Sequence, residues 1–389
     1  MAKTSSNTDA GTLLREITRV RSEMVTVLRE FVECESPSTD RDALNEFGAI
    51  VARHFDVLDA RTRVHKIGST GNAFQFDFAS PTRAPRVLLL GHLDTVYELG
   101  TLDKMPWREN AGKLYGPGVF DMKAGIVQAI FAIQALLAHG PLPCPVSVLL
   151  VPDEEIGSLR SRGITEKLAR ECGRIFVLEP AAGPNGACKV ARKGNGVYTL
   201  RVHGIPAHAG LDFAKGASAI LELSQQIARL GKLSNPARGL TVNPGVIRGG
   251  SRPNVVAAEA EAQIDVRVLT RTQARAIDAR LRRLRPLNRR CRIEVTGGMN
   301  RPPFERNRAT MALYRHAAAC ATELGLKLEH AEVGGASDGN LTSALGIPTL
   351  DGLGAVGDGA HSAGEYVVAA ELPRRSALLA RLLIPVPNP

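Results

Sequence analysis

Three short runs of apolar residues constrain the fold of this chain more than any other feature of its sequence. They are Val87–Gly91, Val146–Val151 and Ile175–Leu178, and a helical stretch of about residues 125–139 separates the first two. Strands that are apolar throughout are typical of a sheet whose two faces are both covered, as in α/β proteins with parallel sheets. The runs therefore predict a mainly parallel sheet between layers of helices.

From about residue 196 the pattern changes to alternating strands, typical of a small sheet with one exposed face. The expected strands lie near residues 197–202, 240–247, 260–268 and 292–295. One helix, near 216–231, precedes the second strand, and an arginine-rich helix precedes the fourth. The order β-α-β-β-α-β is typical of a ferredoxin-like α+β domain with its helices on one face.

The length of the chain, 389 residues, fits two domains better than one. Helical patterns outside the α+β segment lie at about residues 12–33, 41–55 and 308–324. We therefore predict an α/β domain formed by residues 1–194 and 303–389, interrupted by an inserted α+β domain of residues 195–302.

Composition excludes several classes of protein. The apolar fraction of 44% and the charged fraction of 23% are ordinary for a globular chain. Residues 1–10 are polar and no apolar segment follows them, so we expect no secretory signal and a cytoplasmic protein. No run approaches the roughly 20 apolar residues of a membrane span. Six scattered cysteines without a CxxC pair favour reduced, buried thiols over disulfides or a thiolate metal site.

The net charge of +10 is concentrated between Arg267 and Arg292, where ten arginines accompany one aspartate. This stretch contains an apolar stripe at helical spacing, formed by Ile277, Leu281 and Leu284. Arg275 and Arg282 face away from the stripe. One interpretation is a patch for polyanions or acidic substrates, and the other is the solvated face of an amphipathic helix. The absence of interleaved aromatic residues favours the second interpretation and makes a nucleic-acid partner unexpected.

Acidic and imidazole residues follow each of the three apolar runs. His92 and Asp94 follow the first, Glu154 and Glu155 the second, and Glu179 the third. The carboxyl ends of parallel strands meet at one edge of a sheet, so these side chains should converge there. Adjacent carboxylates at the end of a buried strand are costly unless a cation compensates them. The pattern therefore predicts a divalent metal site.

Two glycine-rich turns supply further candidates. Asp121 lies in GPGVFDMKAG, and His361 lies in GDGAHSAGEY. With His92, Glu155 and Glu179 they form a mixed nitrogen and oxygen ligand set suited to zinc, cobalt or manganese. A carboxylate that bridges two metals about 3.5–4 Å apart would complete a two-metal site.

Six motifs, in order along the chain, resemble those of the M20 family of metallopeptidases. They are GHLDTV (91–96), YGPGVFDMKAG (115–125), PDEEIGS (152–158), LEP (178–180), HAG (208–210) and GAHSAGEY (359–366). The resemblance spans about residues 85–367 and is greatest to the glutamate carboxypeptidase (carboxypeptidase G2-like) branch. It implies a di-metal hydrolase domain with an inserted lid and dimerisation domain.

The resemblance also implies a role for each site residue. Two divalent ions, Zn²⁺ in the first place with Co²⁺ and Mn²⁺ as alternatives, would be held by His92, Asp121, Glu155, Glu179 and His361. Asp121 would bridge them, with His92 and Glu179 on one ion and Glu155 and His361 on the other. Glu154 would be the general base, and Asp94 would orient His92. A cis peptide bond is expected after Asp121. For Lys123 two roles stay open: a structural charge at the start of a helix, or a functional group.

Substrate contacts follow from the same resemblance. His208, from the inserted domain of a second subunit in a homodimer, would stabilise the oxyanion; the alternative is a simple loop histidine. The residues expected to hold the substrate are Asn254 and Arg267 at its free carboxylate, Arg301 at a glutamate side chain, Ser337 in the loop 334–340, and Lys189. A hinge role is the alternative for Arg301.

The expected function is hydrolysis of the amide bond of a C-terminal or N-acylated amino acid, with glutamate preferred. The substrate would be a small peptide or an N-acyl amino acid. Three other M20-type activities stay open: an acetylornithine or succinyl-diaminopimelate type deacylase, an aminoacylase and a dipeptidase. A non-enzymatic polyanion binder that uses the Arg267–Arg292 stretch is the remaining alternative.

Overall fold

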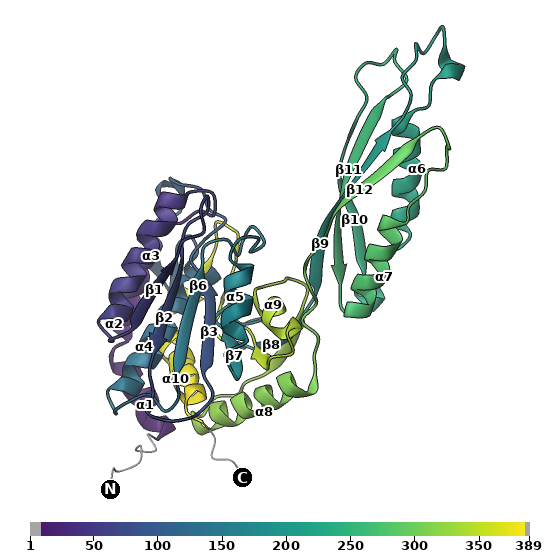
Figure 1. The fold of residues 1–389 in the computed structure, drawn as a ribbon. Helices are drawn as coiled ribbons and strands as arrows, with labels where there is room; N and C mark the ends of the chain where they lie inside the picture. The colour runs from purple at the N-terminus through teal and green to yellow at the C-terminus, as the bar shows by residue number, and fades with distance from the viewer. Residues whose placement is uncertain (1–8, 386–389) are drawn as a thin grey trace. The chain divides into compact units, whose positions relative to one another are not determined.

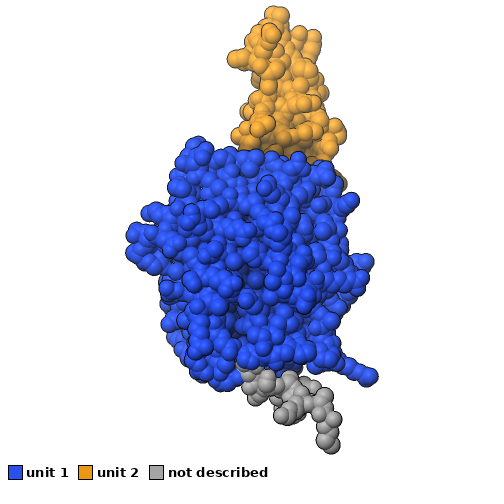
Figure 2. Space-filling model, turned by 90° about the vertical axis from the view of Figure 1, so that its left-hand side faces the viewer, with its two compact units in different colours: residues 1–191, 306–333, 337–389 blue, residues 192–305, 334–336 orange. Residues whose placement is uncertain are grey.

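A computed structural model describes residues 9–385 of the chain, which divide into two compact units (Figures 1 and 2). Unit 1 combines residues 1–191, 306–333 and 337–389, and unit 2 combines residues 192–305 and 334–336. The predicted insertion falls within unit 2. Residues 1–8, on which the expectation about a secretory signal partly depends, lie outside the described residues.

Unit 1 is built around a six-stranded mixed sheet with the strand order β1-β2-β6-β3-β7-β14 (Figure 1). Its strands are β1 (Arg61–His65), β2 (Ala73–Phe78), β3 (Val87–His92), β6 (Val146–Val151), β7 (Arg174–Val177) and β14 (Thr349–Leu350). Neighbours from β6 to β14 are parallel, whereas β1 and β2 run antiparallel to theirs. The α/β class is confirmed, with a mixed sheet.

The antiparallel strands β1 and β2 were missed in the sequence because they lack a continuous apolar run. β1 is an edge strand with exposed arginines, and β2 carries Gln75 and Asp77 among its phenylalanines. These two polar side chains are satisfied within the fold, since Gln75 donates to Asp77 and Asp77 accepts from Ser147 of β6. Hydrogen bonds within β2 and from β6 therefore satisfy the polar side chains at these positions.

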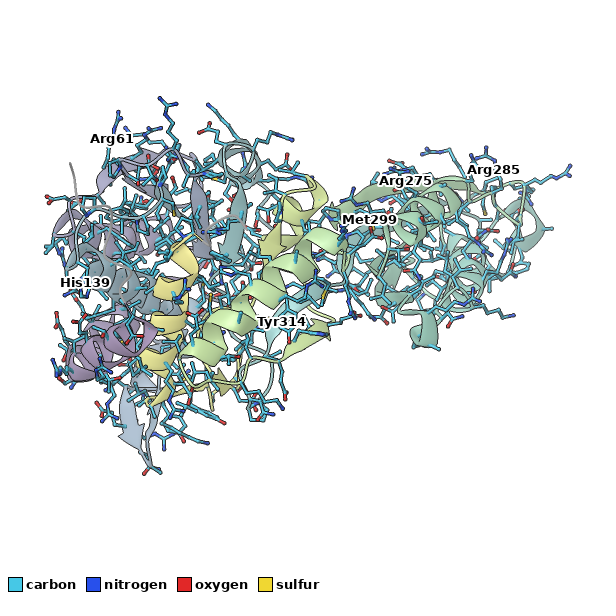
Figure 3. The ribbon with its side chains drawn as sticks, turned by 90° about the horizontal axis from the view of Figure 1, so that it is seen from below. Arg61, His139, Arg275, Arg285, Met299 and Tyr314 are labelled. Carbon is cyan, nitrogen blue, oxygen red and sulfur yellow. The ribbon has the colours of Figure 1, made fainter. Side chains whose placement is uncertain are left out.

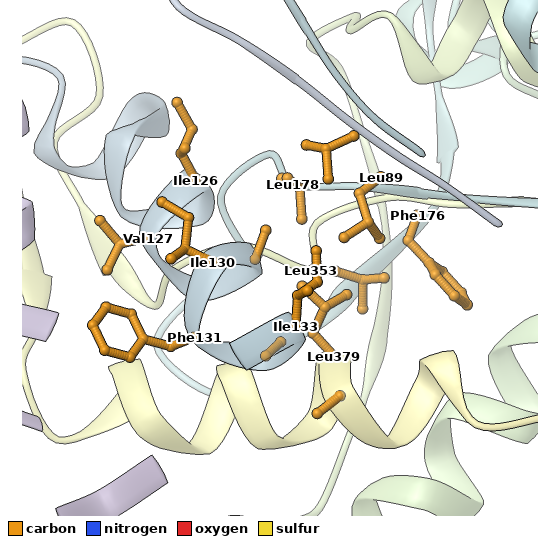
Figure 4. Packing of buried hydrophobic residues seen from close by; sticks show 14 of the residues in the cluster. Leu89, Ile126, Val127, Ile130, Phe131, Ile133, Phe176, Leu178, Leu353 and Leu379 are labelled. Atoms are coloured by element: carbon orange, nitrogen blue, oxygen red, sulfur yellow. The ribbon is translucent and has the colours of Figure 1, made fainter. Parts of the chain in front are cut away.

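Helices cover both faces of this sheet. They are α1 (Ala10–Arg19), α2 (Arg21–Glu33), α3 (Arg41–Asp56), α4 (Ala124–Leu137), α5 (Arg162–Ala169), α8 (Arg308–Glu323), α9 (Gly339–Ala344) and α10 (Glu371–Leu383). Alternate residues of β3 enter different clusters: Leu89 packs with α4 and α10, as Figure 4 shows, whereas Leu88 packs with α5. Burial on both faces explains why β3 and β6 read as mainly apolar runs.

The helix predicted over about residues 12–33 is two helices, because α1 ends at Arg19 and α2 begins at Arg21. Central helix α4 has nearly every side chain buried. With the turn before it, Val119–Leu137 is long and apolar enough to cross a membrane by length and composition, but 83% of it is buried inside the protein. Its apolar character therefore reflects its place in the core.

Short elements around the main sheet were not predicted. A four-stranded sheet in the order β15-β16-β5-β4 consists of β4 (Arg108–Asn110), β5 (Lys113–Tyr115), β15 (Gly357–Asp358) and β16 (Tyr366–Val368). A two-stranded sheet pairs β8 (Cys188–Arg192) with β13 (His330–Val333). Single turns are η1 (Thr101–Asp103) and η2 (Val119–Lys123). The first of these sheets brings the segment around residue 115 beside the segment around residue 366.

Unit 2 is an antiparallel sheet in the order β10-β11-β9-β12 with two helices on one face (Figure 1). Its elements are β9 (Gly194–His203), η3 (Phe213–Lys215), α6 (Ala219–Gly231), η4 (Pro236–Arg238), β10 (Thr241–Gly249), β11 (Glu259–Val268), α7 (Arg271–Arg282) and β12 (Arg292–Arg301). Alternate residues of β9 and β11 are buried against α6 and α7. This unit has its own apolar core.

The arginine-rich helix is α7, and its predicted amphipathic character is confirmed. Ile277 and Leu281 are buried, whereas Arg275 and Arg282 are exposed. Figure 3 shows Arg275 and Arg285 on the surface of unit 2. A groove of about 740 Å³ beside α7 is lined by Arg229, Arg280, Arg283 and Arg285 together with Ala276, Ala279, Leu284, Pro286 and Leu287. All six cysteines are free and five are buried, as expected for reduced thiols.

Candidate metal centre

The candidate centre lies where β3, β6 and β7 end. His92 is the last residue of β3 and is paired in register with Val151, the last residue of β6. Glu154 and Glu155 follow in the turn after β6, and Glu179 follows β7. The parallel arrangement of these strands brings the three chain segments to one edge, as predicted.

One group of ligands forms around His92. Its Nε2 atom lies 3.1 Å from Oδ1 of Asp121 and 3.5 Å from Oε1 of Glu179. His92 and Glu179 are buried, with His92 only 2% exposed, and Asp121 is partly buried. One imidazole nitrogen and two carboxylate oxygens within 4.8 Å of one another suit a divalent ion.

A second group forms around His361. Its Nε2 atom lies 3.2 Å from Oε1 of Glu155 and 3.5 Å from Oδ2 of Asp121. Asp121 therefore belongs to both groups, and each of its oxygens faces a different histidine. The peptide bond between Asp121 and Met122 is cis, as the motif resemblance implied. A carboxylate placed between two such groups is the arrangement that two-metal hydrolases require.

The charges of the cluster demand a cationic counterpart. Burial lowers the pKa of His92, but its contacts with Asp121, Asp94 and Glu179 outweigh this and hold the pKa well above its usual range. Hydrogen bonds to Asp121 and Glu155 raise the pKa of His361 to about 10. Burial raises the pKa of Glu155. The clustered carboxylates are therefore stabilised by positive charge, and divalent ions would supply that charge.

Asp94 organises the turn around the centre. Nδ1 of His92 lies 2.9 Å from the Asp94 carbonyl and 3.4 Å from its Oδ1 atom. The backbone N–H groups of Glu154 and Glu155 each donate to the Asp94 carboxylate over 3.1 Å, and Ser38 donates to it over 2.7 Å. Asp94 therefore holds the ring of His92 with Nε2 toward Asp121, and at the same time fixes the two glutamates.

Residues that sequence reasoning missed hold the remaining turns. Asp153 accepts hydrogen bonds from the backbone of Arg160 and Ser161, and Ser158 donates to Asp338 of the loop 334–340. The carboxylate of Glu365, four residues after His361, accepts from the backbone N–H of Asp121. Asp153 and Ser158 lie inside the motif PDEEIGS and Glu365 lies inside GAHSAGEY, which was the available signal, but the motifs alone do not indicate which backbone groups these side chains hold.

Ser337, a predicted substrate residue, lies in the interior of its loop. Its side chain is completely buried, donates to Asp351 over 2.6 Å and accepts from the backbone of Gly339. The hydroxyl therefore stabilises its own loop, and its contact with a substrate stays a prediction. Lys189 is a buried residue of β8, and its backbone N–H donates to the carbonyl of Asp351.

The other predicted substrate residues belong to unit 2. His208 is exposed, and its Nδ1 atom accepts from the backbone N–H groups of Gly210 and Leu211. The ring proton must then reside on Nε2, which can donate to an oxyanion. Asn254 lies beside it, since its carbonyl accepts from Ala209. Arg267 is paired with Asp265 across 3.0 Å, and buried Arg301 ends β12.

Comparison with known proteins finds a matching family model and a similar protein of known name. The family model described as peptidase family M20/M25/M40 matches residues 88–384. Carboxypeptidase G2 from Pseudomonas sp. (strain RS-16) is 29% identical over 305 residues, which cover 77% of this chain and 73% of that protein.

Solved structures agree in fold. The aminopeptidase PepT from Bacillus cereus superposes with a TM-score of 0.76 at 20% identity, over 94% of this chain and 98% of that one. The YXEP protein of Bacillus subtilis, a dinuclear metal-binding peptidase, superposes with a TM-score of 0.70 at 16% identity, over 94% and 98%.

Proposed function

Because this chain belongs to peptidase family M20/M25/M40, we propose that it is a two-metal carboxypeptidase that releases a C-terminal amino acid. The predicted family is thereby confirmed, and the chain is a hydrolase of that family. The likeness to carboxypeptidase G2, and to a peptidase described as dinuclear, supports the more detailed proposal.

The shared carboxylate of Asp121 is the observation that carries this proposal. Its Oδ1 atom is 3.1 Å from His92 and its Oδ2 atom is 3.5 Å from His361. A single metal site would not need the second group of ligands formed by Glu155 and His361. Two divalent ions held here would supply a water of lowered pKa and polarise the amide carbonyl.

The residues of the chain supply the proton chemistry. Glu154 is 8% exposed and stands beside the ligand Glu155 with its backbone fixed by Asp94. We propose that its carboxylate takes a proton from the attacking water and returns it to the leaving amine. His208 would stabilise the oxyanion through Nε2, because Nδ1 is occupied by two backbone donors.

We expect His208 to act on the partner subunit of a homodimer. β10 is an edge strand of the unit 2 sheet and carries the exposed side chains of Val246 and Ile247, and the first turn of α6 adds exposed Ile220 and Leu221. An apolar edge strand is suited to pairing with its own copy about a two-fold axis.

A panel of substrates tests the reaction. After loading with Zn²⁺, Co²⁺ or Mn²⁺, we expect hydrolysis of peptidyl and N-acyl derivatives of glutamate in preference to those of leucine, lysine and ornithine. Arg301 and Arg267 are the groups proposed to recognise the two carboxylates. Equal rates on glutamate and leucine derivatives would remove the preference, and activity confined to free dipeptides or to acetylornithine would assign one of the alternative activities.

Glu154→Gln tests the mechanism. Loss of the general base should lower kcat by about 10²- to 10⁴-fold without loss of metal, whereas Glu166→Gln on α5 serves as a control. Mixing Glu154→Gln with His208→Ala tests action between subunits, since one site of the mixed dimer keeps both groups. Recovery of activity in the mixture is expected, and His203→Ala should behave like wild type. A mixture that stays inactive although dimers exchange would place His208 outside the partner's site.

A further inference from the structure

The carboxylate of Glu365 connects the two turns that carry Asp121 and His361. It is completely buried, and its Oε1 atom accepts from the backbone N–H groups of Phe120 and Asp121 over 2.8 and 2.9 Å. Its Oε2 atom accepts from Gly118 over 3.0 Å. One side chain thus satisfies three backbone donors in the loop of the shared ligand, while its own backbone belongs to the turn of His361.

Tyr97 adds a third segment to this connection. Its hydroxyl lies 2.6 Å from Oε2 of Glu365 and 3.0 Å from the carbonyl of Ser362, the residue after His361. Tyr97 stands in the loop that follows β3, whose last residue is His92. Segments around residues 97, 120 and 365 therefore meet at one buried carboxylate.

The two metal positions depend on this connection to different degrees. His92 belongs to a central strand and is held by Asp94, and the carbonyl of Glu179 accepts from the backbone of Gly354. His361, by contrast, has a side chain that is 49% exposed and stands in a turn at a φ of 61°. Its spacing from Asp121 is set by the turn that Glu365 anchors.

We propose that Glu365 is a positioning residue that sets the spacing between Asp121 and His361 and thereby the affinity of the second metal position. Tyr97 supports it by fixing the orientation of its carboxylate. This inference rests on the proposed two-metal function and adds a determinant of the strength of the second position.

Glu365→Gln is the decisive variant. The amide keeps the size of the side chain but turns one acceptor atom into a donor, so at least one of the three backbone N–H groups loses its partner. Metal content after dialysis and calorimetric titration with Zn²⁺ and Co²⁺ report binding independently of activity. We expect the second ion to be weakened at least about tenfold, and the first ion, which keeps His92 and Glu179, by a smaller factor. The value of kcat should fall with little change in KM.

Two further variants keep the test interpretable. Glu371→Gln removes a carboxylate at the start of α10, away from the centre, and should bind both ions as wild type does. Tyr97→Phe retains all three backbone contacts of Glu365 and should weaken the second ion by a smaller factor. If Glu365→Gln does not fold, as judged by circular dichroism, Tyr97→Phe decides the question.

Wild-type affinity for both ions in the folded variants would overturn the inference. A wild-type protein that binds fewer than two ions would instead refute the proposed two-metal function on which the inference rests. The two failures are therefore distinguishable in the same titration.

Discussion

Metal binding should release protons from the two histidines of the centre. Hydrogen bonds to Asp121 and Glu155 raise the pKa of His361 to about 10, and the pKa of His92 is held well above its usual range. Both imidazoles therefore carry a proton at pH 7 in protein freed of metal by a chelator. Because a metal ion needs the unprotonated nitrogen, each ion must displace one proton.

The expected magnitude follows from these values. About two protons should leave per chain when both positions fill at pH 7. The affinity of the second position should rise up to about tenfold for each pH unit toward 10, since one proton competes with one ion. The His361 side chain is 49% exposed, so solvent screening will place the upper end of this range below pH 10. The direction remains the same: acidification weakens metal binding.

Calorimetric titration in buffers of different ionisation heat at pH 7 measures the number of protons released. His361→Ala should remove one proton from the count together with the second ion. Release of no protons at pH 7 would show that the imidazoles are neutral before metal binds. The interpretation of this cluster as a set of carboxylates in need of positive charge would then be wrong.

Three further predictions concern other parts of the molecule. Asp94→Asn should weaken metal binding about 10- to 100-fold, measured by calorimetric titration. Ser38→Ala removes only one neutral donor to Asp94 and should have a smaller effect. Equal effects of the two substitutions would contradict the role of Asp94. Glu222→Ala removes the buried carboxylate that accepts from the backbone N–H groups of Leu287 and Asn288, and should lower the free energy of unfolding of unit 2 by about 1–3 kcal/mol, measured by denaturant titration. Heparin should bind the groove beside α7 only weakly at physiological salt. If the protein is instead retained on a heparin column and Arg283→Gln abolishes this retention, the interpretation as a polyanion-binding patch is supported.

The sequence predicted those parts of the fold in which burial is uniform. β3, β6 and β7 read as apolar runs because both of their faces are covered, and the ligands that follow them converge because parallel strands end together. β1 and β2 could not be predicted in the same way. Gln75 shares a hydrogen bond with His65 of β1, Asp77 accepts from Ser147 of β6, and such partners on other strands leave no local pattern.

The two metal positions also differ in how far the pattern of the sequence predicts them. His92 and Glu179 lie at the ends of core strands, so the pattern that builds the sheet also places them. Asp121 and His361 lie in turns, and their positions depend on Glu365, which is distant from Asp121 in the chain. A short motif could identify both ligands through family resemblance, but it could not say what holds them together. That information resides in a contact between segments 244 residues apart, and changes to this contact should therefore weaken the second position more than the first, which keeps His92 and Glu179 in place.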